Sequence, residues 1–585
     1  MNRFLPFLDL RGVRTKDVTQ DVLAALAVTF TAVPQGVAYA LIAGLPPAAG
    51  LYASVLPTIV GSIFRSSRHV VAGPSNAVSL LVGGGVAALA VSVGASPVEI
   101  AISLAFMVGV MQVAAGALRL GSVVDYISAP VVLGYITGAG VLIGVGQLSN
   151  LTGTPEASGN IVAKVVGWTQ GLGELNPLAL GIGITTAVFV AGIRTLAPKL
   201  PSALLGLTLA SIGTVLLGLD SAVSTVGDLA PVPASLPPFT VPTLMDSRLL
   251  VVAFAATVLS LVESSAVGRS IADRTGDRLD ISVEFVGQGL SNLAAAFTGG
   301  YPVSGSLSRS ALNHSAGART RLSGVFVGIL TGVALLVAGP LIDRIPIAAL
   351  AGLLVVVAWD LVNIPRIRQT FRAGWGDGAA FVATVIGTWT LRLDHAIYLG
   401  VTISIVLFLR RARLLVIREL AVDARGRLRE VRSGAGDQCQ QVRVLHVEGS
   451  LFFGAAGELR DGLSQAVAPP NIQALVVRLK RTQGMDITTA TVFAAVAKNL
   501  RDQGRHLILV GMRPDAMRIL KRTGAAAEIG MDNLFPSQKK WFGALDDALR
   551  RALTLTQAEQ DSPLRRYIAM REARSGGRAP RRPPA

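Results

Sequence analysis

Cysteine is almost absent from this chain of 585 residues, which contains a single one, Cys439. One cysteine excludes an intrachain disulfide, and because no Cys/His cluster accompanies it we expect no metal centre and no cofactor. Charged residues are also scarce, at 15% of the chain, whereas 51% of residues are hydrophobic and the mean hydropathy is +0.56. This composition predicts a polytopic membrane protein, too apolar for a soluble enzyme and too long for one domain.

The sequence also lacks the usual signatures of catalysis. It contains no nucleotide loop of the form G-x-x-x-x-G-K-[ST] and no nucleophile with a placed base, so we expect no enzymatic activity. The formal charge is +17, but in a membrane protein a basic excess is first explained by cytoplasmic loops. We therefore expect no nucleic-acid partner.

The apolar residues form segments long enough to cross a bilayer, which takes about 20 residues as a helix and fewer where a helix starts at the midplane. Fourteen such segments are predicted, and the first lacks the cleavage pattern of a signal peptide. The predicted spans are 18–41, 48–65, 76–94, 98–118, 126–147, 175–195, 200–219, 248–270, 281–298, 306–316, 322–341, 345–362, 379–391 and 396–412.

Basic residues gather in alternate loops between these spans. By the positive-inside rule this asymmetry predicts a multi-pass protein of the cell (inner) membrane with both termini in the cytoplasm. The cytoplasmic loops would carry Arg65, Arg68, Arg119, Arg194, Lys199 and the clusters at 269–278, 319–321, 366–372 and 410–413, and the outer loops chiefly Lys164, Arg248, Arg344 and Arg392.

After Arg413 the composition becomes that of a soluble α/β domain, because short β-rich runs alternate with helical patterns. Strands are expected at 442–447, 474–479 and 506–510, and helices at 487–499 and 514–523. The chain is thus divided into a transmembrane domain at 1–415, with repeats at about 18–219 and 248–412, a soluble domain at 440–555 and a basic tail at 556–585 that we expect to be disordered.

Two polar breaks interrupt the apolar segments. PVSGSLSRSALN at 302–313 puts a serine-rich turn and Arg309 inside an apolar run, and GPSN at 73–76 opens another run about 230 residues earlier. An arginine at bilayer depth costs at least about 2.5 kcal/mol, so it persists where a cavity or partner compensates it. Broken backbone at that depth is tolerated only around a cavity or inside protein. We therefore expect the breaks to face each other as halves of a duplicated transporter.

A helix is predicted to start after each break, and both N-termini should reach the midplane because the chain enters the breaks from opposite sides. A helix N-terminus offers unpaired N–H groups and about half a positive charge, which suits an anion. Arg309 adds a full charge, unless it only ties its helix to neighbouring carbonyls. The candidate anion ligands are Ser75, Asn76, Ala77, Gly305, Ser306, Leu307, Ser308 and Arg309.

Glu263 is the carboxylate well inside the predicted span at 248–270. Burial favours its neutral form and a nearby arginine favours its charged form, so Glu263 is a candidate proton carrier. Its protonation would release Arg309 to the anion; the alternative is a permanent ion pair between the two side chains. Ser260 and Ser264 share its helix face by spacing, which predicts a wet pocket.

Pro34 is expected to interrupt the first span. Gln35 and Tyr39 follow it four residues apart and therefore lie on one helix face. A pair of neutral donors suits an oxyanion, although both side chains could equally pack between helices without touching substrate.

These residues are similar to those of a known family, the SulP anion transporters, which include sulfate permeases, bicarbonate transporters and animal anion exchangers. The most specific stretches are PQGVAYALIAGLPPAAGLYAS at 34–54, GPSNAVSLLVG at 73–83 and GSLSRSALNHSAGARTRLSG at 305–324. The soluble end resembles the STAS domain of this family. The resemblance implies 14 transmembrane segments in a 7+7 inverted repeat, divided into core and gate domains, with an elevator-type movement of the core in a homodimer.

The resemblance also implies roles for single residues. The half-helix starts at 75–77 and 306–308 match those that hold the anion, Gln35 and Tyr39 match lining positions, and Arg309 matches an arginine that supplies positive charge. Glu263 occupies an acidic position that looks like an aspartate serving sodium in a bicarbonate member and a glutamate serving protons in plant sulfate members, which favours proton coupling. Asn76 departs from the small or apolar residue usual there and leaves the anion open.

In the soluble domain, MDITT at 485–489 resembles a loop that is phosphorylated two residues after the aspartate in related bacterial regulators. The residue at that position is Thr488, a possible regulatory phosphosite, but Thr489 replaces the glycine that usually follows. The alternative is that Thr488 or Asp486 caps the next helix.

On these observations we expect a secondary active transporter that imports a small inorganic oxyanion, sulfate, together with protons. A sodium-dependent bicarbonate transporter, an uncoupled anion channel or exchanger, and a membrane-anchored regulator are the alternatives. The expected partners are the anion with its proton or sodium, the lipid bilayer, a second copy of the chain and a cytosolic partner of the STAS-like domain.

Overall fold

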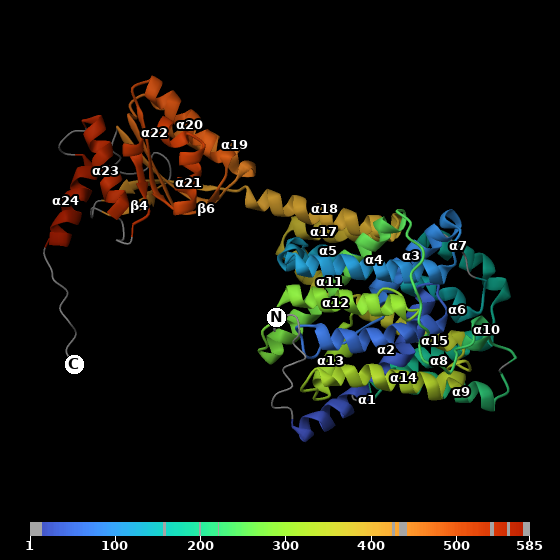
Figure 1. The fold of residues 1–585 in the computed structure, drawn as a ribbon. Coiled ribbons are helices and arrows are strands. Elements are labelled where there is room, and N and C mark those ends of the chain that lie inside the picture. Colours follow the sequence, from blue (N-terminus) through green and yellow to red (C-terminus); the bar gives the residue numbers. More distant parts are fainter. Residues whose placement is uncertain are drawn as a thin grey trace. The chain divides into compact units, whose positions relative to one another are not determined.

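The computed structural model describes residues 14–155, 160–197, 200–219, 221–423, 427–431, 441–538, 543–557 and 562–576. Two compact units make up the chain, Met1–Ile405 and Val406–Ala585, and each is described by itself (Figure 1). Lys199 and Cys439 lie outside the described residues.

The first unit is a bundle of helices, and each of the fourteen predicted spans coincides with one of them. The helices at these positions are α1 Thr15–Ile42, α2 Pro47–Phe64, α3 Asn76–Val93, α4 Pro97–Ala117, α5 Ala129–Gly146, α8 Pro177–Leu196, α9 Ser202–Leu216, α11 Leu249–Thr275, α12 Ile281–Phe297, α13 Leu307–Ser315, α14 Leu322–Ile342, α15 Ile347–Leu361, α17 Trp375–Thr390 and α18 Leu393–Ala412. Shorter helices are α6 Leu148–Thr152, α7 Ile161–Gln170, α10 Val226–Leu229 and α16 Ile364–Ala373, and two strands of two residues are β1 Ala72–Gly73 and β2 Ser304–Gly305.

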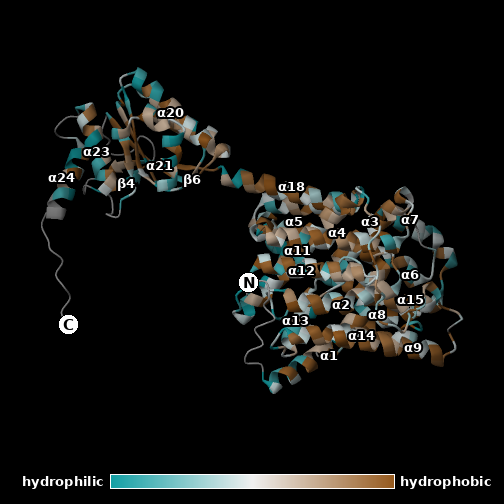
Figure 2. Cartoon of the chain, in the orientation of Figure 1, coloured by the Kyte–Doolittle hydropathy of each residue, from teal (hydrophilic) through white to brown (hydrophobic). Residues whose placement is uncertain are grey.

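Length and hydropathy make many of these helices candidate membrane spans. In the described part of the chain, 9 helices are long and apolar enough to cross a bilayer alone, and α3 and α9 are shorter apolar helices. Figure 2 shows hydrophobic residues along the helices of the first unit, and more hydrophilic residues on the helices of the second. The first unit is therefore the membrane domain of a multi-pass protein, whereas the count of fourteen spans stays a prediction.

The order of elements repeats along the first unit. The series α1, α2, β1, α3, α4, α5 is followed by α11, α12, β2, α13, α14, α15, so that a short strand and a new helix follow two long helices each time. Packing divides the unit differently, because α1 to α4 pack mainly with α11, α12 and α14, whereas α5 and α8 pack with α15 and α17. Each repeat therefore contributes helices to both packed groups, and both breaks lie in the group that contains α1 to α4, α11, α12 and α14.

One local prediction is wrong. Pro34 does not interrupt the first helix, since α1 continues from Thr15 to Ile42 with the proline inside it. A proline removes one backbone hydrogen bond, and close packing on the following turns holds the helix together. Val37, Ala38 and Ala40 in those turns are buried.

The second unit is a six-stranded sheet covered by helices. Its strand order is β4-β3-β5-β6-β7-β8, with β5 to β8 parallel and β3 antiparallel to both neighbours. Alternate residues of the strands point to opposite faces, and Figure 1 shows α20 and α23 on different sides of the sheet. The strands are β3 Val416–Val422, β4 Leu428–Val431, β5 Val442–Leu451, β6 Ala474–Met485, β7 His506–Met512 and β8 Leu534–Pro536, and the helices α19 Ala456–Val467, α20 Ile487–Asp502, α21 Pro514–Arg522, α22 Ala525–Ile529, α23 Gly543–Thr556 and α24 Pro563–Gly576.

The structure corrects both predicted limits of the soluble domain. The sheet begins at Val416 rather than 440, because β3 and β4 add an antiparallel edge to it. The tail is not wholly disordered, since Pro563–Gly576 forms α24, whose Leu564, Tyr567 and Ile568 are buried in one cluster with strand residues. These three apolar residues follow the helical spacing i, i+3, i+4, a signal that an interpretation from the arginines alone overlooked. Residues 577–585 lie outside the described part.

Candidate functional site

The two polar breaks meet as a pair of antiparallel strands. Ala72 of β1 is the partner of Gly305 in β2, and Gly73 is the partner of Ser304. Ser306 N also donates to Val71 O, at 3.0 Å. The prediction that the breaks face each other is therefore confirmed, and the pairing satisfies backbone groups that would be costly unpaired in lipid.

A helix starts directly after each strand, with a serine as its N-cap. Ser75 caps α3 by accepting a hydrogen bond from Val78 N at 3.4 Å, and Ser306 caps α13 by accepting one from Arg309 N at 3.4 Å. The remaining N–H groups of both first turns lie at the same crossing point. Two helix N-termini with their partial positive charges thus converge, as the sequence predicted.

Arg309 lies within this crossing and is 1% exposed. Its Nη2 donates to the carbonyl oxygen of Pro74, so it bridges from α13 to the break before α3. Gly73 makes room for it, because a Cβ on Gly73 would lie 2.5 Å from Arg309 Nη1. Within the described residues, Arg309 Nε is buried and has no hydrogen-bond partner. A buried guanidinium with an unused donor is suited to an anion that completes its hydrogen bonds.

Glu263 lies on α11 beside the first helix start. Ser75 Oγ donates to Glu263 Oε2 at 2.9 Å, and Ser304 is a second hydroxyl at the carboxylate. Arg309 is within electrostatic range of Glu263, but in the described part of the chain the two do not form an ion pair. The carboxylate is thus tied to a helix cap, and the guanidinium to a backbone carbonyl.

Tyr39 of α1 belongs to the same cluster, since its phenol is within electrostatic range of both Arg309 and Glu263. Tyr301, which precedes β2, is also within range of Arg309, and its hydroxyl is 2.8 Å from Ser79 Oγ of α3. Gln35 is 8% exposed, and among the described residues its Oε1 has no hydrogen-bond partner. The one sequence feature that points to Tyr301 is its position just before the second break.

The other candidates differ in where their side chains lie. Ala77 is buried, and Asn76 is half-buried with its Oδ1 turned to Ala77 N at 2.8 Å. Leu307 and Ser308 are exposed in the first turn of α13, where Ser308 Oγ lies 3.4 Å from Ser306 Oγ. Leu307 therefore contributes its backbone to the site rather than a side-chain contact.

Polar side chains of α12 support the second break and were missed by the sequence analysis. Asn292 Oδ1 accepts from Val303 N at 2.7 Å, and Gln288 Nε2 donates to Val303 O at 2.7 Å. Glu284, Gln288 and Asn292 follow one another at four-residue spacing, so a polar stripe on one face of an apolar helix was the available signal.

The two serines predicted to share a wet pocket with Glu263 turn their hydroxyls to protein groups, while Glu263 itself is half-buried, so the wet pocket stays a prediction. Ser260 and Ser264 are fully buried, and Ser260 Oγ donates to Val303 O at 3.0 Å. Ser264 Oγ donates to Gln288 Oε1 at 3.2 Å. Helical spacing placed both serines near Glu263 correctly, but their hydroxyls satisfy protein groups because the second break packs directly on α11.

Comparison with known proteins decides the family. The family model described as "Sulfate permease family" matches residues 18–384, and the model described as "STAS domain" matches residues 437–540. The chain belongs to the sulfate permease family. The matched residues 18–384 include both breaks and every residue of the site described above.

Similar proteins cover most of this permease family member. "Sulfate transporter 4.1, chloroplastic" of Arabidopsis thaliana is 26% identical over 576 residues, covering 92% of this chain and 80% of that one. Human "Solute carrier family 26 member 6" is 30% identical over 476 residues, covering 76% and 62%. The solved structure of SLC26A9 matches with a TM-score of 0.85 at 19% identity, covering 96% of this chain and 94% of that one. At that identity the likeness shows the fold.

The transmembrane domain of the cyanobacterial bicarbonate transporter BicA has the same fold as the membrane domain of this permease family member. The TM-score is 0.60 at 20% identity, and the match covers 67% of this chain and 98% of that one. The fold is therefore shared by proteins whose names give different anions, and it does not by itself assign one.

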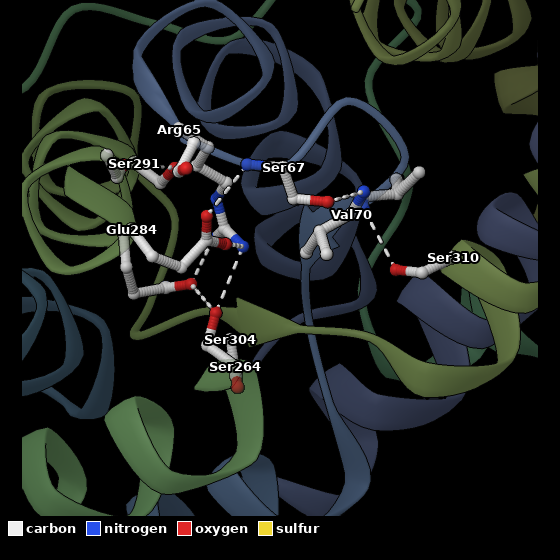
Figure 3. A network of polar contacts seen from close by, with 12 residues as sticks. Arg65, Ser67, Val70, Ser264, Glu284, Ser291, Ser304 and Ser310 are labelled. Carbon is white, nitrogen blue, oxygen red and sulfur yellow. Dashed lines mark hydrogen bonds and ion pairs between the residues drawn. The ribbon is translucent and has the colours of Figure 1, made fainter. Parts of the chain in front are cut away.

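A buried ion pair lies beneath the second break of this permease family member (Figure 3). Arg65 Nη1 is 3.2 Å from Glu284 Oε1 and donates to Ser264 Oγ at 3.0 Å, while its Nη2 donates to Gln288 Oε1. Both charged side chains are fully buried. The loop after α2, the middle of α11 and α12 are thus joined by this pair and its hydrogen bonds.

In the STAS domain, Thr488 lies exposed in the first turn of α20. It does not cap the helix. Asp486 is the N-cap, accepting from Thr489 N at 2.9 Å, and Thr489 closes a capping box with it. The capping alternative is therefore confirmed for Asp486, and the Thr488 hydroxyl is accessible from outside.

Proposed function

We propose that this protein is a secondary active transporter that imports sulfate in symport with protons. The observation that carries the proposal is the antiparallel pairing of β1 with β2, which brings two capped helix N-termini and the buried Arg309 to one point. Such a site suits a small inorganic oxyanion with more than one charge, because several donors surround it. The names of relatives such as sulfate transporter 4.1 support sulfate as that oxyanion.

The proposed ligands divide into three kinds. Backbone N–H groups of the first turns, at Asn76, Leu307 and Ser308, face the anion as helix-terminus donors, and Ala77, whose N–H donates to Asn76 Oδ1, lies beside them. Arg309 supplies the full positive charge through its unused Nε donor. Ser75, Ser306, Gln35 and Tyr39 supply neutral groups around it.

Glu263 is the proposed proton carrier. It accepts the Ser75 hydroxyl hydrogen bond at the cap of α3, so its negative charge lies beside the place where the anion would bind. Two negative charges in a low-dielectric site repel each other, and a proton on Glu263 removes that repulsion. Anion and proton therefore bind together more favourably than either alone, which is the condition for symport.

We propose that the core bundle, built from α1 to α4 and α11 to α14, carries the anion past the gate bundle in an elevator-type movement. The basic residues in alternate loops support an inner-membrane protein with both termini on the cytoplasmic side. The protein would act as a homodimer, and a cytosolic partner or phosphorylation at Thr488 would act on the STAS domain.

Uptake of labelled sulfate into proteoliposomes under an imposed pH gradient tests the coupling. The wild type should concentrate sulfate only with an inward proton gradient, and Glu263→Gln should take up sulfate at a rate that no longer follows the gradient. Glu174→Gln is the matched control, because Glu174 is an exposed carboxylate outside the site. Coupling that survives in Glu263→Gln would overturn the role of Glu263.

The same preparation separates the alternatives. Stimulation by sodium with bicarbonate as the preferred competitor would identify a sodium-dependent bicarbonate transporter. Currents larger than carrier turnover, or uptake that no ion gradient drives, would identify an uncoupled channel or exchanger. Either result would replace proton–sulfate symport while leaving the anion site in place.

A further inference from the structure

A short basic helix, α16, follows α15 at one end of the membrane domain. Asn363 separates the two helices, since its Oδ1 accepts from Arg366 N at 3.0 Å as the N-cap of α16. The sequence of α16, IPRIRQTFRA, holds three arginines and no acidic residue. No residue of α16 is buried. Because so little protein covers this charged helix, its arginines must be accommodated by something outside the chain.

The position of α16 fixes the end of the membrane domain at which it lies. It packs against α17 and α5. The chain enters α16 just after α15 ends at Leu361 and leaves it just before α17 starts at Trp375. α16 therefore lies at the level where the membrane helices end, which is the headgroup level of a bilayer.

Contacts of Phe371 fix the orientation of α16 on the bundle. The ring of Phe371 lies edge-on to that of Phe381 in α17, with centroids 5.8 Å apart. Gly378 permits this approach, because a Cβ there would lie 2.9 Å from Phe371 Cδ1. Ile364 and Ile367 lie on the same helix face as Phe371 by spacing. The apolar face is thus held to α17, and the arginines project from the rest of the helix.

The arginines of α16 have no partner among the residues that the structure describes. Across the described ranges of the chain, the side chains of Arg366, Arg368 and Arg372 make no hydrogen bond or ion pair. Two exposed tryptophans flank the helix, Trp359 before it and Trp375 after it, with 69% and 84% of their surfaces exposed. Tryptophans at the ends of spans prefer the membrane–water interface. Trp359 and Trp375 thus indicate the headgroup level for α16, as does its position at the ends of the membrane helices.

From these observations we infer that α16 is a binding surface for anionic phospholipids, whose headgroup phosphates pair with Arg366, Arg368 and Arg372. Charge complementarity selects this occupant, because three guanidiniums at headgroup depth face the phosphates of the leaflet and cations there attract anionic lipid. The apolar face and the tryptophans hold the helix in the plane of the interface. This surface is separate from the anion site and does not depend on the proposed transport activity.

The test uses the full-length protein in vesicles and a fluorophore on α16. Cys439, the single cysteine, is replaced by serine, and exposed Gln369 is replaced by cysteine and labelled. Vesicles of fixed phosphatidylcholine and phosphatidylglycerol content carry bromine on one lipid or the other, and quenching of the fluorophore reports which lipid adjoins the helix. We expect phosphatidylglycerol to be enriched at least about twofold over its bulk share, and the enrichment to fall with added salt.

Two charge variants decide the outcome. The enrichment should disappear in R366Q/R368Q/R372Q and persist in R460Q/R518Q/R522Q, which removes three exposed arginines of the STAS domain instead. Equal quenching by both lipids in the parent, or enrichment that survives the α16 variant, would overturn the inference. Loss of enrichment on adding inorganic phosphate, at an ionic strength matched with sodium chloride, would do so too, because it would show a free-anion site. Circular dichroism and gel filtration confirm that the variants are folded.

Discussion

Ser75 Oγ connects the cap of a half-helix to a half-buried carboxylate: it donates to Glu263 Oε2 at 2.9 Å while accepting from Val78 N at 3.4 Å. A change in the charge of Glu263 therefore alters the hydrogen bonding and the electrostatic potential at the first turn of α3, where the anion is proposed to bind. In the proposed mechanism, coupling would pass through this oxygen atom instead of through the Glu263–Arg309 ion pair considered from the sequence.

Replacing Ser75 with alanine should weaken this connection. Loss of an N-cap hydroxyl costs about 1 kcal/mol of helix stability, and the carboxylate loses a donor that favours its charged form. We expect the KM for sulfate to rise, because the proposed site loses a neutral group and a helix cap. The dependence of KM on pH should shift to higher pH, because the carboxylate would lose a hydrogen bond to its charged form. Ser75→Thr keeps the hydroxyl and should resemble the wild type. A wild-type pH profile of KM in Ser75→Ala would show that the bond has no part in coupling.

Replacing Gly73 with alanine should displace Arg309. Gly73 has φ +147°, a conformation that favours glycine, and its new Cβ would lie 2.5 Å from Arg309 Nη1. We expect sulfate affinity, measured by calorimetry on the purified protein, to fall by about tenfold or more, equivalent to about 1.4 kcal/mol. Gly173→Ala is the control, since nothing lies within 4 Å of its added Cβ. Unchanged affinity in the Gly73 variant would remove Arg309 from the anion site.

Removing one partner of the Arg65–Glu284 pair should destabilise the membrane domain. Both side chains are 0% exposed, and an unpaired buried charge costs about 3–5 kcal/mol. Arg65→Met and Glu284→Leu should each lower the unfolding temperature in detergent, whereas the double variant should recover part of the loss.

The surface pair Arg194–Asp360 is the comparison for that experiment, because both side chains are 44% exposed. Exposed pairs contribute about 0–1 kcal/mol, so Asp360→Asn should change the unfolding temperature little. Equal effects at the two pairs would contradict the structural role assigned to Glu284.

Acid should destabilise the STAS domain through His446 on β5. Burial, and then the charge of Arg478, hold the pKa of His446 below its usual value of 6.5 despite its hydrogen bond to Glu448. The fold favours neutral histidine, so this contribution to stability is complete above the unfolded pKa and is lost as pH falls from there through the lower folded pKa. Arg481 lowers the pKa of Glu448, which extends the loss of stability to more acidic pH.

Amide hydrogen exchange of β5 and β6 in the full-length protein measures this effect. Exchange should speed up as pH is lowered from about 7.5 to 5.5, after correction for the intrinsic rate, and His446→Gln should flatten the change. Thr488 lies in a different part of the domain, and its replacement by alanine should leave the profile as it is. A pH dependence that persists in His446→Gln would assign it to another group.

Local sequence patterns determined much of this protein. The apolar segments predicted helices within a few residues of those observed, because burial in lipid requires long apolar runs with satisfied backbone. Ser75 and Ser306 were recognisable as helix starts, because serine after a proline or glycine break caps a helix. Strand periodicity predicted β5, β6 and β7 in the same way.

Tertiary structure alone decided which of these pieces touch. The hydrogen-bond partners of Ser260, Ser264 and Glu263 lie on other elements, so helical spacing could place the side chains on a face but could not say what covered it. Pro34 remained inside α1, and the arginine-rich tail folded as α24, because packing against neighbours outweighed local propensity in both places. The sequence by itself determined the parts of an anion site, and the packing of α11 and α12 on the two breaks decided its partners.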